Sequence, residues 1–155
     1  MLRFKVLVSA VPLIAAAFLA RLELFSNPKP CIAVGEQTVE LTDASWHADL
    51  HVSFTDDPRL ATVRVAVTED AGSADFTVID DAAADDGGAC GSASTARLVA
   101  IDRTASGPSA PVIYLSDDEG AADYRIFVRS KRFTARDAAA LIVGSHDQHL
   151  ALNAS

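Results

Sequence analysis

The chain has 155 residues, of which 50% are hydrophobic and 22% are charged, so it fits one small globular domain with a short additional segment. Its formal net charge is −8, and residues 1–30 are basic, so the remainder is strongly acidic. An acidic domain repels nucleic acid phosphates at long range. Composition therefore excludes a second hydrophobic core and argues against nucleic-acid binding.

The N-terminal segment, residues 1–25, has the pattern of an export or anchoring sequence. Arg3 and Lys5 precede an apolar run over residues 6–20. This run predicts a hydrophobic helix that is an uncleaved membrane anchor or a cleaved signal peptide, with a buried helix of the globular domain as a further alternative. Basic residues before such a run stay in the cytoplasm. We therefore expect the rest of the chain on the periplasmic side of the inner membrane, either tethered or secreted after cleavage.

A Pro-rich spacer at residues 26–30 leads into the domain, which begins at Cys31. The second cysteine, Cys90, lies in a glycine-rich loop. Two cysteines in an exported domain usually form a disulfide, because the compartment is oxidising. We predict a disulfide between Cys31 and Cys90, with two unpaired thiols as the alternative.

One phrase occurs twice in the chain, at residues 68–78 and at residues 116–126. The two copies are offset by 48 residues, and a weaker third copy around residues 42–52 is offset by 26 from the first. Each copy has an apolar residue, Ser or Thr, an acid, a short connection and then Ala-Asp before another apolar run. The connection is too short for a parallel crossover, so we expect a strand–turn–strand hairpin or corner.

The aspartates of the repeated phrase, Asp49, Asp75 and Asp123, are predicted to have a structural role. An Asp beside a turn can accept backbone N–H groups with its carboxylate. This interpretation removes them from the set of candidate catalytic residues.

The pattern of alternating apolar residues predicts an α+β fold. We expect a mainly antiparallel sheet of about six strands with a C-terminal helix that begins at Thr134 and ends near Gly144, preceded by the N-terminal hydrophobic helix. The globular domain then spans residues 31–144, and residues 145–155 form a flexible tail. The strands are predicted near residues 48–54, 61–68, 75–80, 97–102, 111–116 and 123–130.

A metal site is suggested by His47, Asp49 and His51. At alternate positions of a strand, their side chains would point to one face, where a divalent metal ion could bind. Exposed strand histidines are the competing interpretation, and Asp49 already has a structural one. We therefore expect no cofactor, with a divalent metal ion as the alternative.

The candidate interaction site follows from a local excess of positive charge. In strand register, Arg125, Phe127, Arg129 and Lys131 share one face, and Arg132 follows them. Arginine and aromatic side chains are common anchors of protein interfaces. An exposed Phe127 among these cations would form a binding patch, unless the cations pair with acidic loops of the same domain.

We therefore predict a non-enzymatic interaction or accessory domain that binds an unknown protein partner, such as a member of a membrane complex, and contacts the inner membrane through its N-terminal segment. The alternatives are a metal-binding module built on His47, Asp49 and His51, and a small hydrolytic enzyme. No catalytic residues are proposed, because no nucleophile, phosphate-binding or redox motif occurs in the chain.

Intact mass spectrometry of the purified protein tests the disulfide and the N-terminal segment together. If Cys31 and Cys90 are bonded, reduction raises the mass by two hydrogen atoms. An unchanged mass would contradict the disulfide. The mass before reduction separates a retained anchor from a signal peptide that has been removed.

Overall fold

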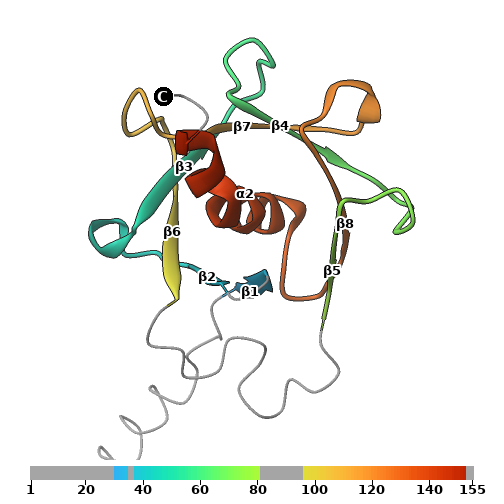
Figure 1. Ribbon diagram of the computed structural model, residues 1–155, viewed down its shortest axis with the longest axis horizontal. Helices are drawn as coiled ribbons and strands as arrows, with labels where there is room; N and C mark the ends of the chain where they lie inside the picture. Colours follow the sequence, from blue (N-terminus) through green and yellow to red (C-terminus); the bar gives the residue numbers. More distant parts are fainter. Residues whose placement is uncertain (1–29, 35–36, 81–95, 153–155) are drawn as a thin grey trace, which may run out of the picture.

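The computed structural model describes residues 30–34, 37–80 and 96–152, which form a curled sheet around a helix (Figure 1). The sheet has eight strands, and the helix, α2, lies inside the curl. The elements in chain order are β1 (Cys31–Val34), β2 (Gln37–Leu41), the 3₁₀ turn η1 (Ser45–His47), β3 (Leu50–Phe54), β4 (Val63–Val67), β5 (Phe76–Ile79), β6 (Arg97–Asp102), β7 (Val112–Ser116), the 3₁₀ turn η3 (Glu119–Ala121), β8 (Tyr124–Arg129) and α2 (Ala135–Leu152).

The prediction of a mainly antiparallel sheet of about six strands is wrong. The strand order is β1-β2-β6-β3-β7-β4-β8-β5, and only the β1–β2 pair is antiparallel. All other neighbouring strands run parallel. The six predicted strands exist at their expected places, and the C-terminal helix is confirmed. The error concerns how the strands are connected in space.

The short connections are possible because consecutive strands are staggered along the sheet. Leu41 at the end of β2 and Leu50 at the start of β3 both pair with Val99 of β6. The chain therefore leaves β2 at the same height at which it enters β3. It only has to cross β6, a distance of about 10 Å for two strand spacings. Without this stagger, the chain would have to run back along the length of the strand before the next parallel strand could begin, which needs a longer connection.

The same relation recurs along the sheet, so two sets of consecutive strands are interleaved. Strands β2 to β5 alternate with β6 to β8, and after β2 no strand pairs with the next one in the chain. The predicted hairpins are absent from the described residues for this reason. Phe54 at the end of β3 and Val63 at the start of β4 both pair with Ile113 of β7. Val67 at the end of β4 and Phe76 at the start of β5 both pair with Ile126 of β8.

The repeated phrase corresponds to this architecture. Val39, Val52, Val65 and Val78 follow one another at intervals of 13 residues, and each is a buried residue of a successive strand. The offset of 26 is two such steps. The offset of 48 relates β4 and β5 to β7 and β8.

Helix α2 supplies the centre of the core. All side chains over residues 138–143 are at most 1% exposed, so this part of the helix is enclosed on every side. Three of these residues are alanines, which allows the sheet to approach the helix closely. The helix begins as predicted: Thr134 Oγ1 accepts the N–H of Asp137 at 3.1 Å, and Asp137 Oδ2 accepts the N–H of Thr134 at 2.9 Å.

The helix continues past Gly144 to Leu152, where we expected a flexible tail. Gly144 is not a helix stop but a place of close packing. A Cβ atom at Gly144 would lie 2.6 Å from Val99 Cγ2, and the Gly144 carbonyl accepts a hydrogen bond from Arg97 at 2.7 Å. The glycine allows α2 to lie directly against β6.

Replacing Gly144 with alanine should destabilise the protein by about 1–3 kcal/mol, because the new methyl group overlaps a β-branched side chain with little freedom to move. In an exposed helix the same change would stabilise by about 1 kcal/mol. Chemical denaturation measures the difference. Gly107→Ala is the control, since a Cβ there meets nothing within 4 Å. A Gly144→Ala variant as stable as the wild type would contradict this packing.

Candidate interaction surface

Arg125, Phe127 and Arg129 of the predicted interaction site lie on the outer face of β8, and Phe127 is buried. Its side chain is 7% exposed, whereas we expected an exposed aromatic. The connection between β4 and β5 has to cross β8, which lies between them, and α2 occupies the inside. Phe127 thus lies on the face that this connection crosses. The guanidinium of Arg129 stands 5.3 Å from its ring centroid, a cation–π contact.

Arg125 is paired within the domain. Its guanidinium donates to Asp75 Oδ1 at 3.1 Å, and its backbone N–H donates to Asp75 Oδ2 at 2.8 Å. These bonds from Arg125 hold the pKa of Asp75 below its ordinary value. The competing interpretation was that the cations pair with acids of the same domain. For Arg125, this interpretation is correct.

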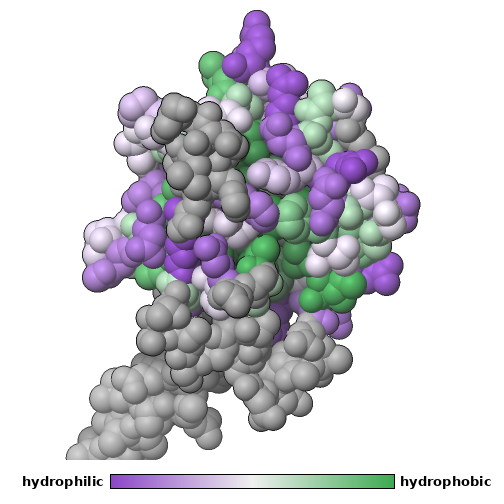
Figure 2. All heavy atoms as spheres, viewed as in Figure 1, coloured by the Kyte–Doolittle hydropathy of each residue, from purple (hydrophilic) through white to green (hydrophobic). Residues whose placement is uncertain are grey.

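Three cations of the predicted site remain exposed, and one of them lies beside an exposed apolar residue. Arg129 is the register partner of Ile79 on the edge strand β5, and Ile79 is 57% exposed. Lys131 and Arg132 follow β8 and are exposed. Figure 2 shows hydrophobic and hydrophilic side chains next to one another on the β5 and β8 side of the molecule. We call Ile79, Arg129, Lys131 and Arg132 the basic patch.

Asp80 orders the turn that carries this patch. Its carboxylate accepts the backbone N–H of Lys131 at 2.6 Å and the hydroxyl of Ser130. Those two bonds and the charge of Arg132 lower the pKa of Asp80. The Ser130 hydroxyl in turn accepts the N–H of Arg132 at 2.9 Å. The backbone of the patch is thus fixed while its cationic side chains project outward.

The predicted metal ligands are not brought together. His47 belongs to the 3₁₀ turn η1, so the three residues do not share the face of one strand. The carboxylate of Asp49 accepts the N–H of Leu98 at 2.8 Å. Within residues 30–34, 37–80 and 96–152, no group of three or more potential ligands could hold a metal ion.

His51 instead contacts Asp102 on the neighbouring strand β6. Its Nδ1 lies 2.9 Å from Asp102 Oδ2, and the hydroxyls of Ser106 and Ser45 donate to the same carboxylate. The hydrogen bond from Ser106 is the main cause of a lowered pKa of Asp102, and the contacts with His51 and Ser45 lower this pKa further. A carboxylate that orients an imidazole is common in general bases. Here both serine hydroxyls donate to the carboxylate of Asp102. The cluster therefore links strands β3 and β6 to η1, which carries Ser45, and to the β6–β7 connection, which carries Ser106.

The sequence did not indicate the His51–Asp102 contact, because the residues are far apart in the chain and meet only through the parallel β3–β6 register. By contrast, the structural role expected for the repeated aspartates is confirmed. Each accepts a backbone N–H at 2.8 Å at the start of a neighbouring strand rather than within its own turn: Asp49 from Leu98, Asp75 from Arg125 and Asp123 from Arg64.

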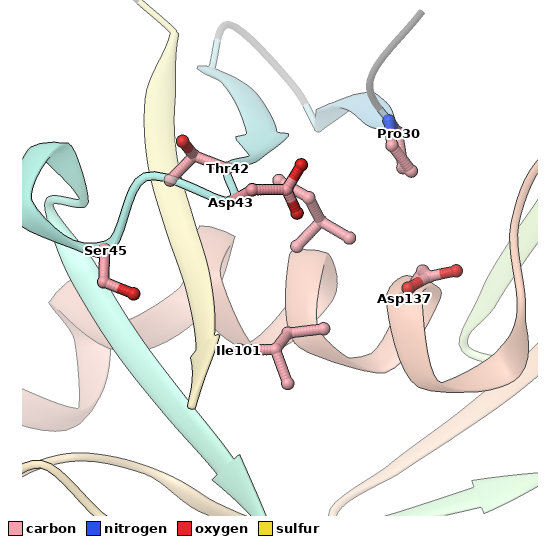
Figure 3. Close-up of a pocket in the computed structure, with 7 residues that line it drawn as sticks. Pro30, Thr42, Asp43, Ser45, Ile101 and Asp137 are labelled. Atoms are coloured by element: carbon pink, nitrogen blue, oxygen red, sulfur yellow. The ribbon is translucent and has the colours of Figure 1, made fainter. Parts of the chain in front are cut away.

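A cavity of about 290 Å³ opens where β2 and β6 end and α2 begins (Figure 3). Asp43 and Asp137 lie at its sides, and Leu41 and Ile101 provide its apolar lining. Asp137 already caps α2. The remaining lining residues are Pro30, Thr42 and Ser45.

Comparisons with protein-family models, with curated proteins and with solved structures found no match to this chain. In the described part of the chain, no helix is long and apolar enough to cross a membrane. The predicted N-terminal hydrophobic helix lies outside the described residues. Cys90 also lies outside them, so its disulfide with Cys31, the first residue of β1, stays a prediction.

Asp75→Ala should reduce the free energy of unfolding by about 1 kcal/mol at neutral pH, because the hydrogen bonds to Arg125 are lost from a partly exposed site. The folded-state pKa of Asp75 is lowered, so its contribution is present above the unfolded pKa of about 3.9 and disappears as the pH falls through the folded value. Urea titrations at several pH values measure this.

The exposed Asp56 provides the control for Asp75. Asp56→Ala should change stability by less than about 0.5 kcal/mol at every pH. If the loss from Asp75→Ala were as large in strong acid as at neutral pH, the ionised carboxylate would not be its cause.

Proposed function

We propose that this protein is a non-enzymatic interaction domain, exported to or tethered on the periplasmic side of the inner membrane, and that its basic patch binds an acidic surface of a partner protein. One observation carries the proposal: three exposed cations lie within residues 129–132, and the first, Arg129, is the register partner of the exposed Ile79, on a domain that is otherwise acidic. The proposed location depends on residues 1–25, whose sequence is that of an anchor or signal.

The charge distribution supports an acidic partner. Residues 31–124 contain four Lys or Arg and eighteen Asp or Glu, whereas residues 125–136 contain five basic residues. Arg125 is engaged by Asp75, whereas Arg129, Lys131 and Arg132 are exposed. Complementary charge accelerates and orients association, and it disfavours partners that share the acidic character of this domain.

Each side chain of the patch has a distinct part in this proposal. Ile79 offers the apolar contact that can be desolvated at the centre of an interface, while Lys131 and Arg132 supply charge around it. Phe127 is buried, so it acts by supporting Arg129 rather than by touching the partner. This differs from the direct anchoring role that its residue type suggested.

Charge reversal of the patch tests the proposal. The triple variant Arg129→Glu, Lys131→Glu, Arg132→Glu should lose a partner that cross-links to the wild-type chain in membranes, because attraction becomes repulsion. The wild-type complex should also weaken as salt is raised. Quantitative mass spectrometry of the cross-linked material measures both effects.

A matched control carries the same change of net charge elsewhere. The variant Arg59→Glu, Arg64→Glu, Arg103→Glu alters three exposed arginines away from the patch and should retain the partner. Equal recovery by both triple variants, or equal loss in both, would contradict binding through the basic patch.

A further inference from the structure

Trp46 is the only tryptophan of the chain and the most exposed large hydrophobic residue in its described part, with 81% of its surface accessible. Tryptophan is usually well buried in soluble domains because its ring is large and apolar. The function proposed above does not use this residue, since it lies on the β2–β3 connection, whereas the patch lies on β5 and β8.

The turn that carries Trp46 is firmly held. The N–H groups of His47 and Ala48 donate to Ala44 and Ser45 at 2.9 and 3.2 Å, which closes η1. Before the turn, Thr42 Oγ1 accepts the N–H of Ala44 at 3.1 Å. The exposed indole therefore projects from an ordered backbone and not from a loose loop.

This turn lies next to the point at which the chain enters the domain. The carbonyl of Pro30 accepts the N–H of Leu41 at 2.8 Å, where β2 ends. Pro30 also lines the same cavity as Asp43 and Ser45, the latter adjacent to Trp46 (Figure 3). Any surface that holds the segment before Pro30 is thus close to the Trp46 turn.

The length of the spacer sets how close that surface is. Residues 26–30 separate the apolar N-terminal segment from the domain, and fully extended they reach at most about 17 Å. If residues 1–25 lie in a bilayer, the Trp46 turn is held within reach of its surface. Tryptophan is enriched at membrane interfaces, where an apolar ring with one polar N–H is stable.

We infer that Trp46 inserts into the interfacial layer of the membrane that anchors the chain, and that it fixes the orientation of the domain there. This inference rests on the membrane tether in the proposed function. The exposed Asp43 lies three positions before Trp46, so a zwitterionic lipid surface fits this turn better than an anionic one.

The single tryptophan makes a direct test possible. The full chain is reconstituted into phosphatidylcholine vesicles with and without brominated acyl chains, isolated by flotation, and its tryptophan emission is recorded. Insertion predicts a blue-shifted emission, at least about twofold quenching by the brominated lipid, and protection from iodide in the water. Adding anionic phosphatidylglycerol should reduce the quenching.

A matched control moves the fluorophore to another connection. In the double variant Trp46→Phe, Leu60→Trp, the indole replaces an apolar side chain that is 65% exposed on the β3–β4 connection, across β6 and β3 from β2. Its emission should resemble that of an indole in water. Equal lipid quenching of the two proteins would overturn the inference.

Flotation separates the possible failures. A wild-type chain that floats with the vesicles but is quenched only by iodide keeps the tether and overturns the role of Trp46. A chain that does not float overturns both the tether and this inference, whereas protein binding through the basic patch would still be tested by its own charge reversals.

Discussion

The fold depends on the stagger between consecutive strands. Leu41 at the end of β2 and Leu50 at the start of β3 share Val99 as their register partner. The next strand therefore begins at the level along the sheet at which the previous strand ends, and the chain does not have to run back along the strand between them. Each consecutive pair among β2, β3, β4 and β5 is separated by one strand position in the sheet. Strands β6, β7 and β8 occupy these three positions. Stagger also curls a sheet, since tilted strands tend to close around an axis. The interior of that curl is occupied by α2.

This arrangement separates structural positions from positions that can interact. Inward side chains face α2, and outward side chains in the middle of the strands lie under the crossing connections. Ser53, Ala66 and Ala100 are outward residues with at most 2% exposure, and the turns η1 and η3 contact β6 and β4. Function is therefore expected at the connections and at the edge strands, where Trp46 and the basic patch lie.

The sequence predicts six of the eight strands and the C-terminal helix, but it does not predict β1 and β2 or the arrangement of the strands. Strand positions follow from period-two alternation, and the Thr134 and Asp137 pair marks the start of α2. A connection of eight residues suggests a hairpin unless the strands are staggered, and alternation carries no information on stagger. The interval of 13 residues between Val39, Val52, Val65 and Val78 was the available signal. It is clearer than the offsets of 26 and 48.

The candidate site was predictable only in part. The excess of cations near β8 is visible in the sequence, whereas the burial of Phe127 and the pairing of Arg125 with Asp75 depend on the strand order. The structural role of the repeated aspartates could be inferred from their repetition. Their actual partners could not, because each N–H belongs to a strand that is distant in the chain.

Nuclear Overhauser contacts between backbone protons in isotope-labelled protein test the interleaved sheet most directly. The interleaved strand order predicts contacts of β4 with both β7 and β8, including Val63 with Ile113 and Val65 with Tyr124. It also predicts that β4 and β5 make no ladder contacts with each other, since β8 lies between them. A regular ladder of contacts between β4 and β5 would contradict the interleaved arrangement.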